Sequence, residues 1–363
     1  MEPGPIYSVD ADIARASTIE ARFYSDAAAH EALKSRVFAR TWQWIGDLAD
    51  VAEPGSLSPR DLLPGFLDEP LLLARDASGT LRCLSNVCTH RGNILVAAPC
   101  RAKEIRCGYH SRRFDLAGTM TFMPEFKEAS NFPSPSDNLP RVAFGEWAGL
   151  PFAAVDPVAP LQDYLGDMVR RLGAMPFAEL RFDPARSRDY EIDAHWALYV
   201  ENYLEGFHIP FVHQGLNEVV DYGSYASELQ RYSNLQLALA KDGEPAFTRP
   251  ASSPDHGKRV AAYYFWVFPN LMLNFYPWGL SVNRVEPQGL AATRIAFRSY
   301  VWDASKLDAG AGSALDRVEM EDEAIVRAVS RGVRSRFYKR GRYSPTRERG
   351  VHHFHRLLCE FLE

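Results

Sequence analysis

The chain has 363 residues, of which 46% are hydrophobic and 24% are charged, and its formal net charge at pH 7 is −5. This length is typical of about two domains that fold without disulfide bonds. The acidic balance excludes a broadly basic surface, so we expect no nucleic acid and no membrane as a partner. Residues 1–17 lack the order of a signal peptide and the five cysteines are few, which indicates a cytoplasmic protein.

The N-terminal part of the chain predicts one helix followed by a β domain. Residues 26–40, DAAAHEALKSRVFAR, have a helical pattern that Ser25 precedes as the N-cap residue. Between 41 and 155, short apolar runs alternate with turn signals such as LPG, ASG and LAG, which is typical of a small antiparallel β domain. The proline-rich segment DPVAP at 156–160 marks its end.

The remainder of the chain is mixed. The pattern predicts a helix over about 193–209, strands over 261–301 and a long helix over about 314–339. We therefore predict an α+β fold, in which the β domain is followed by a mixed domain with an antiparallel sheet, made of residues 1–40 and 160–363.

Two pairs of cysteine and histidine lie inside the predicted β domain. The first is CTHRG, with Cys88 and His90, and the second is CGYH, with Cys107 and His110. A structural zinc site is one explanation, although zinc fingers usually keep like ligands together. In a Rieske [2Fe–2S] cluster two cysteines hold one iron and two histidines hold the other, so two loops that each supply both irons need mixed pairs. The mixed order favours the Rieske cluster over zinc or chance.

The two pairs resemble the Rieske motif, C-x-H followed by C-x-x-H. By this resemblance Cys88 and Cys107 ligate one iron, and His90 and His110 ligate the other. Tyr109 then occupies a position from which a hydroxyl group tunes the cluster by hydrogen bonding.

A second group of ligand-type side chains occurs in ENYLEGFHIPFVH, where Glu205, His208 and His213 lie close together. Residues five apart on a regular helix point about 140° away from each other, so the two histidines do not share a metal on one helix. Pro210 disfavours helix at the residue before it, which would leave His208 at a helix end and His213 on a redirected chain. Taken alone, Glu205 also fits a solvated helix face.

A third ligand is expected from the acidic segment of the long C-terminal helix. At 100° per residue, Asp322 falls at the centre of the apolar face, whereas Glu321 and Glu323 point away and Glu319 lies at its edge. That face consists of Val318, Ile325, Val326, Val329, Val333 and Phe337. A carboxylate in such a stripe needs a compensating charge, which is either a metal or an arginine.

Both motifs together resemble those of the Rieske non-haem iron oxygenases. The resemblance implies that His208, His213 and Asp322 bind a mononuclear Fe(II) that activates O₂. It implies that Glu205 bridges a Rieske histidine of one subunit to an iron histidine of the next in a homotrimer. The chain has no Gly-rich phosphate loop, so electrons from NAD(P)H would arrive through a separate flavin and iron–sulfur reductase.

The segment 339–358 is similar to the tails of oxygenases that act on choline, betaine and carnitine-type compounds. This resemblance implies hydroxylation or oxidative N-demethylation of a small quaternary ammonium substrate. Aromatic faces attract such cations, and candidates for the pocket are Tyr203, Phe265, Tyr276 and Trp278.

Three other functions stay open at this point. An aromatic-ring hydroxylating monooxygenase or dioxygenase would use the same irons with a different pocket. A Rieske electron-transfer protein would lack oxygenase activity, and a structural zinc protein would lack both irons.

Overall fold

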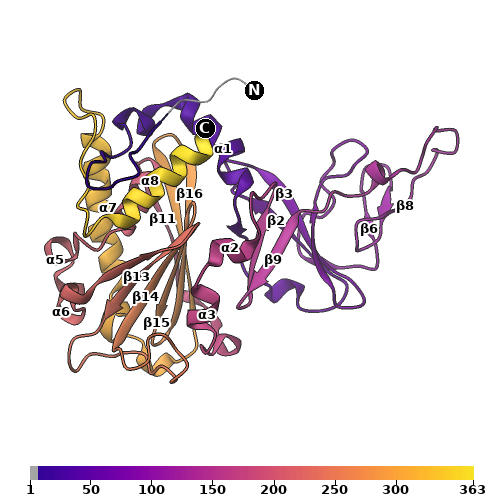
Figure 1. Cartoon of the computed structure of the whole chain (residues 1–363). Helices are drawn as coiled ribbons and strands as arrows, with labels where there is room; N and C mark the ends of the chain where they lie inside the picture. The colour runs from indigo at the N-terminus through magenta and orange to yellow at the C-terminus, as the bar shows by residue number, and fades with distance from the viewer. Residues whose placement is uncertain (1–6) are drawn as a thin grey trace. The chain divides into compact units, whose positions relative to one another are not determined.

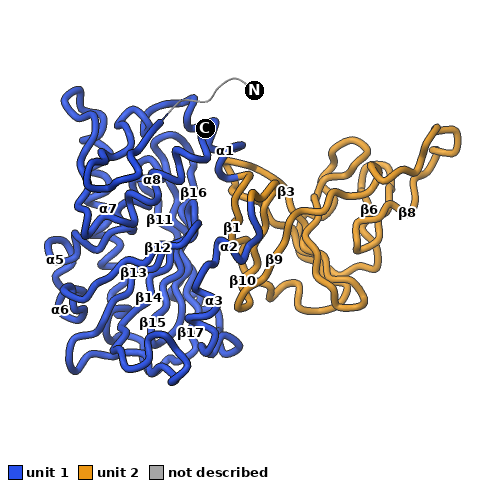
Figure 2. Tube along the Cα trace, viewed as in Figure 1, with its two compact units in different colours: residues 1–38, 159–363 blue, residues 39–158 orange. Residues whose placement is uncertain are grey.

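The computed structural model describes residues 7–363 (Figure 1). The chain divides into two compact units, which are drawn in different colours in Figure 2. One unit spans Ala39–Val158, and the other combines the residues up to Phe38 with Ala159–Glu363.

The unit 39–158 is built of short antiparallel sheets. A four-stranded sheet has the order β4-β3-β2-β5, with strands Leu81–Ser85, Glu69–Arg75, Ser56–Leu62 and Cys100–Arg101. A three-stranded sheet, β1-β10-β9, comprises Gln43–Trp44, Leu150–Ala154 and Ala143–Trp147. The third sheet, β6-β7-β8, comprises Ile105–Arg106, Arg113–Phe114 and Met120–Phe122. Apolar side chains of the first and third sheets share one core, and the two Cys/His loops lie over it.

The other unit is organised around a seven-stranded antiparallel sheet in the order β11-β17-β16-β15-β14-β13-β12. In chain order its strands are Arg181–Ile192, Ala226–Leu229, Ser233–Leu239, Val260–Val267, Leu271–Tyr276, Gly279–Gly289 and Ala292–Val301. Every residue of β14 and β15 is buried, so both faces of the central strands are covered. The α+β fold and the strands over 261–301 are confirmed.

Helices cover this sheet. They are α1 Ala27–Arg36, α2 Leu161–Leu165, α3 Met168–Leu172, α4 Trp196–Tyr203, α5 Ile209–Val212, α6 Gln214–Val219, α7 Leu315–Gly332 and α8 Arg349–Leu362. Helix α4 packs on β16 and against both α7 and α8. Helix α8 lies beside α1 (Figure 1). None of the helices within residues 7–363 has the length and apolar character needed to cross a bilayer.

Three predicted helices have different bounds in the structure. Helix α1 begins after Asp26 rather than Ser25, because the Asp26 carboxylate accepts hydrogen bonds from the N–H groups of Ala28 and Ala29. The helix expected over 193–209 ends at Tyr203. The helix expected over 314–339 ends at Gly332, a residue type that disfavours helix continuation.

A buried hydrogen-bonded cluster joins segments that are far apart in the sequence. The Oε1 atom of Glu201 in α4 accepts a hydrogen bond from the Tyr24 hydroxyl at 2.7 Å and lies 3.1 Å from Nε2 of His355. The Nδ1 atom of His355 lies 2.6 Å from the Tyr343 hydroxyl, and the imidazole is fully buried. Glu201 is therefore a structural residue and not part of a solvated face.

Candidate metal centres

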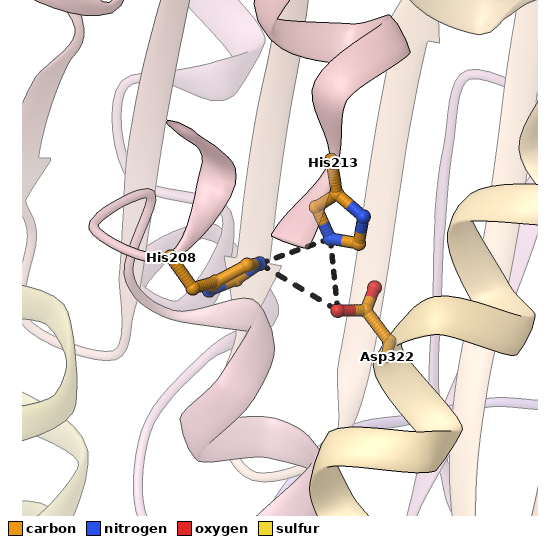
Figure 3. A group of neighbouring side chains, drawn as sticks. All are labelled: His208, His213 and Asp322. Carbon is orange, nitrogen blue, oxygen red and sulfur yellow. Dashed lines mark hydrogen bonds and ion pairs between the residues drawn. The ribbon is translucent and has the colours of Figure 1, made fainter. Parts of the chain in front are cut away.

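The side chains of His208, His213 and Asp322 converge on one point (Figure 3). The two Nε2 atoms lie 3.1 Å apart, and Oδ1 of Asp322 lies 3.0 Å from Nε2 of His213 and 3.5 Å from Nε2 of His208. Two imidazoles and one carboxylate on one side of a point form the donor set that non-haem Fe(II) oxygenases use, with other positions left open. The residues present therefore fit a mononuclear iron.

The local backbone explains how two histidines five residues apart meet. His208 precedes the short helix α5 and His213 follows it. Pro210 lies in the first turn of α5, where its missing N–H costs nothing, so it starts a new helix instead of ending the old one. The predicted role of Pro210 is corrected accordingly: α4 has already ended at Tyr203, and the two histidines flank a single turn.

A carboxylate lies at the Nδ1 atom of each histidine, the ring nitrogen that does not face the metal position. Glu205 Oε1 lies 2.6 Å from Nδ1 of His208, and Glu321 Oε2 lies 2.8 Å from Nδ1 of His213. Glu205 Oε2 also accepts the backbone N–H of His208 at 3.0 Å, and Glu321 Oε1 accepts from Arg317 at 3.0 Å. Such partners keep the proton on Nδ1 and leave Nε2 free as a metal ligand.

The charge balance at this point favours a cation. Burial alone lowers the pKa of His213, but the adjacent carboxylates of Asp322 and Glu321 outweigh burial and raise it above its ordinary value. Without a metal, the imidazole thus tends to hold a proton that partly offsets the negative charge of its neighbours.

Helix α7 presents a different face to the protein than its apolar pattern predicts. Ile325 and Val329 are 39% and 42% exposed, whereas the buried residues are Glu319, Glu323, Val326 and Ser330. Asp322 lies on the inward side, and its Oδ1 accepts a hydrogen bond from Asn202 at 2.6 Å. Its neighbours are this amide and the two imidazoles, so the arginine ion pair considered from the sequence does not form within residues 7–363.

Sequence reasoning missed Glu321 and Glu319 because it took the apolar stripe as the buried side. The signal available was the density of acidic residues around Asp322. The segment 316–323 contains five carboxylates, Asp316, Glu319, Glu321, Asp322 and Glu323. Glu319 accepts a hydrogen bond from Tyr199 and Glu321 lies beside His213, and helical periodicity does not describe such contacts with other elements.

An open cavity lies beside the histidines and Asp322, and the centre of a water molecule can occupy about 100 Å³ of it. Of the predicted pocket residues, Tyr203 and Tyr276 line it. Phe265 does not, because the neighbouring residue Tyr264 points into the cavity and successive strand residues face opposite sides. Trp278 is also outside the lining and stacks on Tyr276 with the ring centroids 5.2 Å apart.

The loops of the predicted cluster site have the same backbone pattern. The N–H of Cys88 donates to the carbonyl of Asn93, and the N–H of Gly92 donates back to the carbonyl of Cys88. Cys107 makes the equivalent bonds with the residues five and four positions further along. The fifth residues of the two loops, Gly92 and Ser111, have φ of 70° and 60°. Two similar turns therefore present one cysteine and one histidine each.

The side chains of this site fit a cluster with two irons. Cys88 and Cys107 are each 2% exposed, and the rings of His90 and His110 lie with centroids 4.7 Å apart. Both Nδ1 atoms are buried and have no hydrogen-bond partner among the described residues. Buried nitrogens without partners are costly, and coordination to iron would satisfy them.

Tyr109 contacts this site through its ring and its backbone. Its ring lies 3.7 Å from the ring of His110, and its backbone N–H points at Sγ of Cys107 at 3.4 Å. Burial alone raises the pKa of the Cys107 thiol, but the N–H groups of Tyr109 and His110 outweigh burial and lower it below the usual value. The backbone of Tyr109 therefore acts on the cysteine. Its side chain is 60% exposed, and the tuning of the cluster by its hydroxyl stays a prediction.

Comparisons with known proteins agree with both centres. The family model for the Rieske [2Fe–2S] domain matches residues 41–133, and that for the ring hydroxylating alpha subunit catalytic domain matches residues 180–363. The chain is 30% identical to a chloroplastic choline monooxygenase of Arabidopsis thaliana, over 95% of this chain and 82% of that protein. It is also 30% identical to the carnitine monooxygenase oxygenase subunit of Escherichia coli K12, over 94% and 93%.

Solved structures show the same fold. A quaternary ammonium Rieske monooxygenase superimposes with a TM-score of 0.76 at 23% identity, covering 98% of this chain and 100% of the other. Naphthalene 1,2-dioxygenase from Rhodococcus sp. gives a TM-score of 0.69 at 19% identity, covering 95% and 93%. This chain belongs to the Rieske-type non-haem iron oxygenases, as an oxygenase (alpha) subunit with a Rieske [2Fe–2S] domain and a catalytic domain that carries a candidate His-His-Asp iron site.

Proposed function

We propose that the chain is the oxygenase component of a multicomponent monooxygenase that hydroxylates or oxidatively N-demethylates a small quaternary ammonium compound. The observation that carries the proposal is a cavity beside the candidate iron ligands with five tyrosines in its wall, Tyr199, Tyr203, Tyr225, Tyr264 and Tyr276. Aromatic faces attract ammonium cations that have no N–H to donate. The names of the choline and carnitine monooxygenases to which the chain is similar support the same substrate class.

In this proposal each centre has a defined set of residues. His208, His213 and Asp322 hold the mononuclear iron, and Glu205 fixes the orientation of His208. Bound Fe(II) supplies the open coordination positions at which O₂ is activated. The chain's own contribution is to keep both imidazole Nε2 atoms directed at one point and to place the substrate beside them.

The proposed electron path begins in the domain 41–155. Cys88 and Cys107 would ligate one iron of the [2Fe–2S] cluster, and His90 and His110 the other. Electrons would come from a separate flavin and iron–sulfur reductase, as expected for an oxygenase subunit. We also propose a homotrimer in which the carboxylate of Glu205 connects a cluster histidine of one subunit to His208 of the next; the 2.6 Å contact with His208 supports one half of that connection.

Product analysis with a substrate panel tests the function. The purified oxygenase, loaded with iron and cluster, is supplied with NADH and a generic reductase, and oxygen uptake is measured with quaternary ammonium compounds and with aromatic acids. We expect uptake coupled to product, with formaldehyde release where a methyl group is removed, only for the ammonium compounds. Coupled turnover of aromatic acids alone would replace this proposal with a ring-hydroxylating function.

A further inference from the structure

The charged groups in the cavity wall are all acidic, apart from the two histidines of the candidate iron site. Glu205, Glu319 and Asp322 line the cavity, and its lining within residues 7–363 includes no arginine and no lysine. Glu205 is bound to His208, and Asp322 faces both imidazoles. Glu319 is therefore the one carboxyl group of the wall that the metal centre does not use.

Glu319 is held in the wall in an unusual state for a glutamate. Its side chain is 3% exposed, and Oε2 accepts a hydrogen bond from the Tyr199 hydroxyl at 2.5 Å. Its Oε1 is buried and has no hydrogen-bond partner among the described residues. Burial raises the pKa of this carboxyl to about 8. The carboxyl therefore holds a proton in the empty cavity at neutral pH, and a cation bound beside it would stabilise the carboxylate and release that proton.

The remaining polar groups of the wall are neutral. The amides of Asn202, Gln236, Asn274 and Asn283 line the cavity with the five tyrosines. Several of these groups are already paired: Tyr203 donates to Asn274 at 2.6 Å, and Asn202 donates to Asp322 at 2.6 Å. A quaternary ammonium ion cannot donate a hydrogen bond, so a carboxylate that ionises beside it and aromatic faces are the features that recognise it.

We propose that Glu319 is the counter-ion of the substrate's ammonium group, and that the cavity therefore prefers a cation that carries no carboxylate over a zwitterion of the same size. This inference rests on the proposed quaternary ammonium function and narrows it. A substrate carboxylate placed beside Glu319 and Glu205 would meet like charges and no arginine or lysine of the wall, and like charges at close range are disfavoured.

A matched pair of ligands tests the preference on the unmodified protein. Choline and glycine betaine share the trimethylammonium group and differ by an alcohol in place of a carboxylate. Titration calorimetry on the iron- and cluster-loaded oxygenase without reductant measures both affinities, independently of turnover and of the reductase. We expect choline to bind at least tenfold more tightly. Equal or tighter binding of betaine would overturn the preference and leave the quaternary ammonium function standing, whereas failure of both ligands to bind would overturn both proposals.

A pair of variants tests the assignment to Glu319. Glu319→Gln keeps the shape and the acceptor for Tyr199 but removes the charge, so we expect choline affinity to fall at least tenfold and betaine affinity to change less. Glu323→Gln is the control, because Glu323 lies one turn further along the same helix, is also buried, and is outside the cavity. Iron content and melting temperature show whether each variant is folded. Unchanged choline affinity in a folded Glu319→Gln protein would refute the role of Glu319, and the wild-type comparison remains decisive if that variant does not fold.

Discussion

The Oε2 atom of Glu321 lies 2.8 Å from Nδ1 of His213, the ring nitrogen opposite the one that faces Asp322. Glu205 stands in the same relation to His208, so both candidate iron histidines have a carboxylate behind them. These carboxylates arrive from different elements: Glu205 from the loop after α4, and Glu321 from α7.

Removing the charge of Glu321 is expected to weaken iron binding. In Glu321→Gln the amide cannot stabilise the Nδ1 proton of His213 as a carboxylate does, and losses of about 10- to 100-fold in metal affinity are typical of such changes. Iron content after dialysis against a graded chelator measures the effect. Glu218→Gln, an exposed glutamate on α6, serves as the control and should behave like the unmodified protein. Equal iron retention in both variants would show that Glu321 does not support His213.

Asp322→Ala should lose the mononuclear iron and keep the [2Fe–2S] cluster, since Asp322 contacts only groups of the catalytic unit. Iron analysis is expected to fall from about three to about two irons per chain while the visible Rieske absorbance is unchanged. Asp316→Ala, which removes an exposed carboxylate from the first turn of the same helix, should retain all of the iron. If the two variants bind the same amount of iron, Asp322 is not a ligand.

Glu319 should make stability depend on pH. Burial raises its pKa from 4.5 to about 8, so the folded protein binds this proton more tightly than the unfolded chain. The resulting stability is fully present below pH 4.5 and is lost as the pH rises through 8. Melting temperatures recorded between pH 5 and 8 should therefore fall less steeply for Glu319→Gln than for the unmodified protein. Parallel curves would mean that Glu319 is ionised throughout this range.

Gly92 and Gly108 offer a matched pair of substitutions in the cluster loops. A Cβ atom at either position meets no neighbour within 4 Å, but only Gly92 has a left-handed backbone, with φ of 70°. Gly92→Ala is expected to destabilise the domain by about 1 kcal/mol, and Gly108→Ala by much less. The temperature at which the cluster absorbance is lost on heating measures the stability of both variants. Equal melting temperatures would indicate that the loop relaxes around residue 92.

The two candidate iron histidines could be predicted from sequence because their geometry is local. His208 and His213 lie within one short segment that contains a proline, and they can share a metal only if the helix is broken between them. The other partners come from α7, whose position against α4 depends on tertiary packing. Its apolar residues Ile325 and Val329 are partly exposed while Glu319 is buried, so the hydrophobic pattern of α7 gave the wrong face for the neighbours of Asp322.

The predicted pocket residues also show that tertiary packing limits what can be predicted from the sequence. Phe265 and Tyr276 belong to adjacent buried strands in which every residue is covered, so composition does not reveal which side chains border a cavity. Strand register determines which side chains border the cavity, and register is a property of the assembled sheet.

The buried contact between Glu201 and His355 has a consequence for how the protein is made. Glu201 lies at the end of α4, just before the loop that carries Glu205 and His208, and its partner belongs to α8. On the ribosome, α4 emerges before α8, so the support of this loop stays incomplete until α8 has been synthesised. Iron loading of the catalytic site is thus expected to require that α8 has been made and has packed against α4.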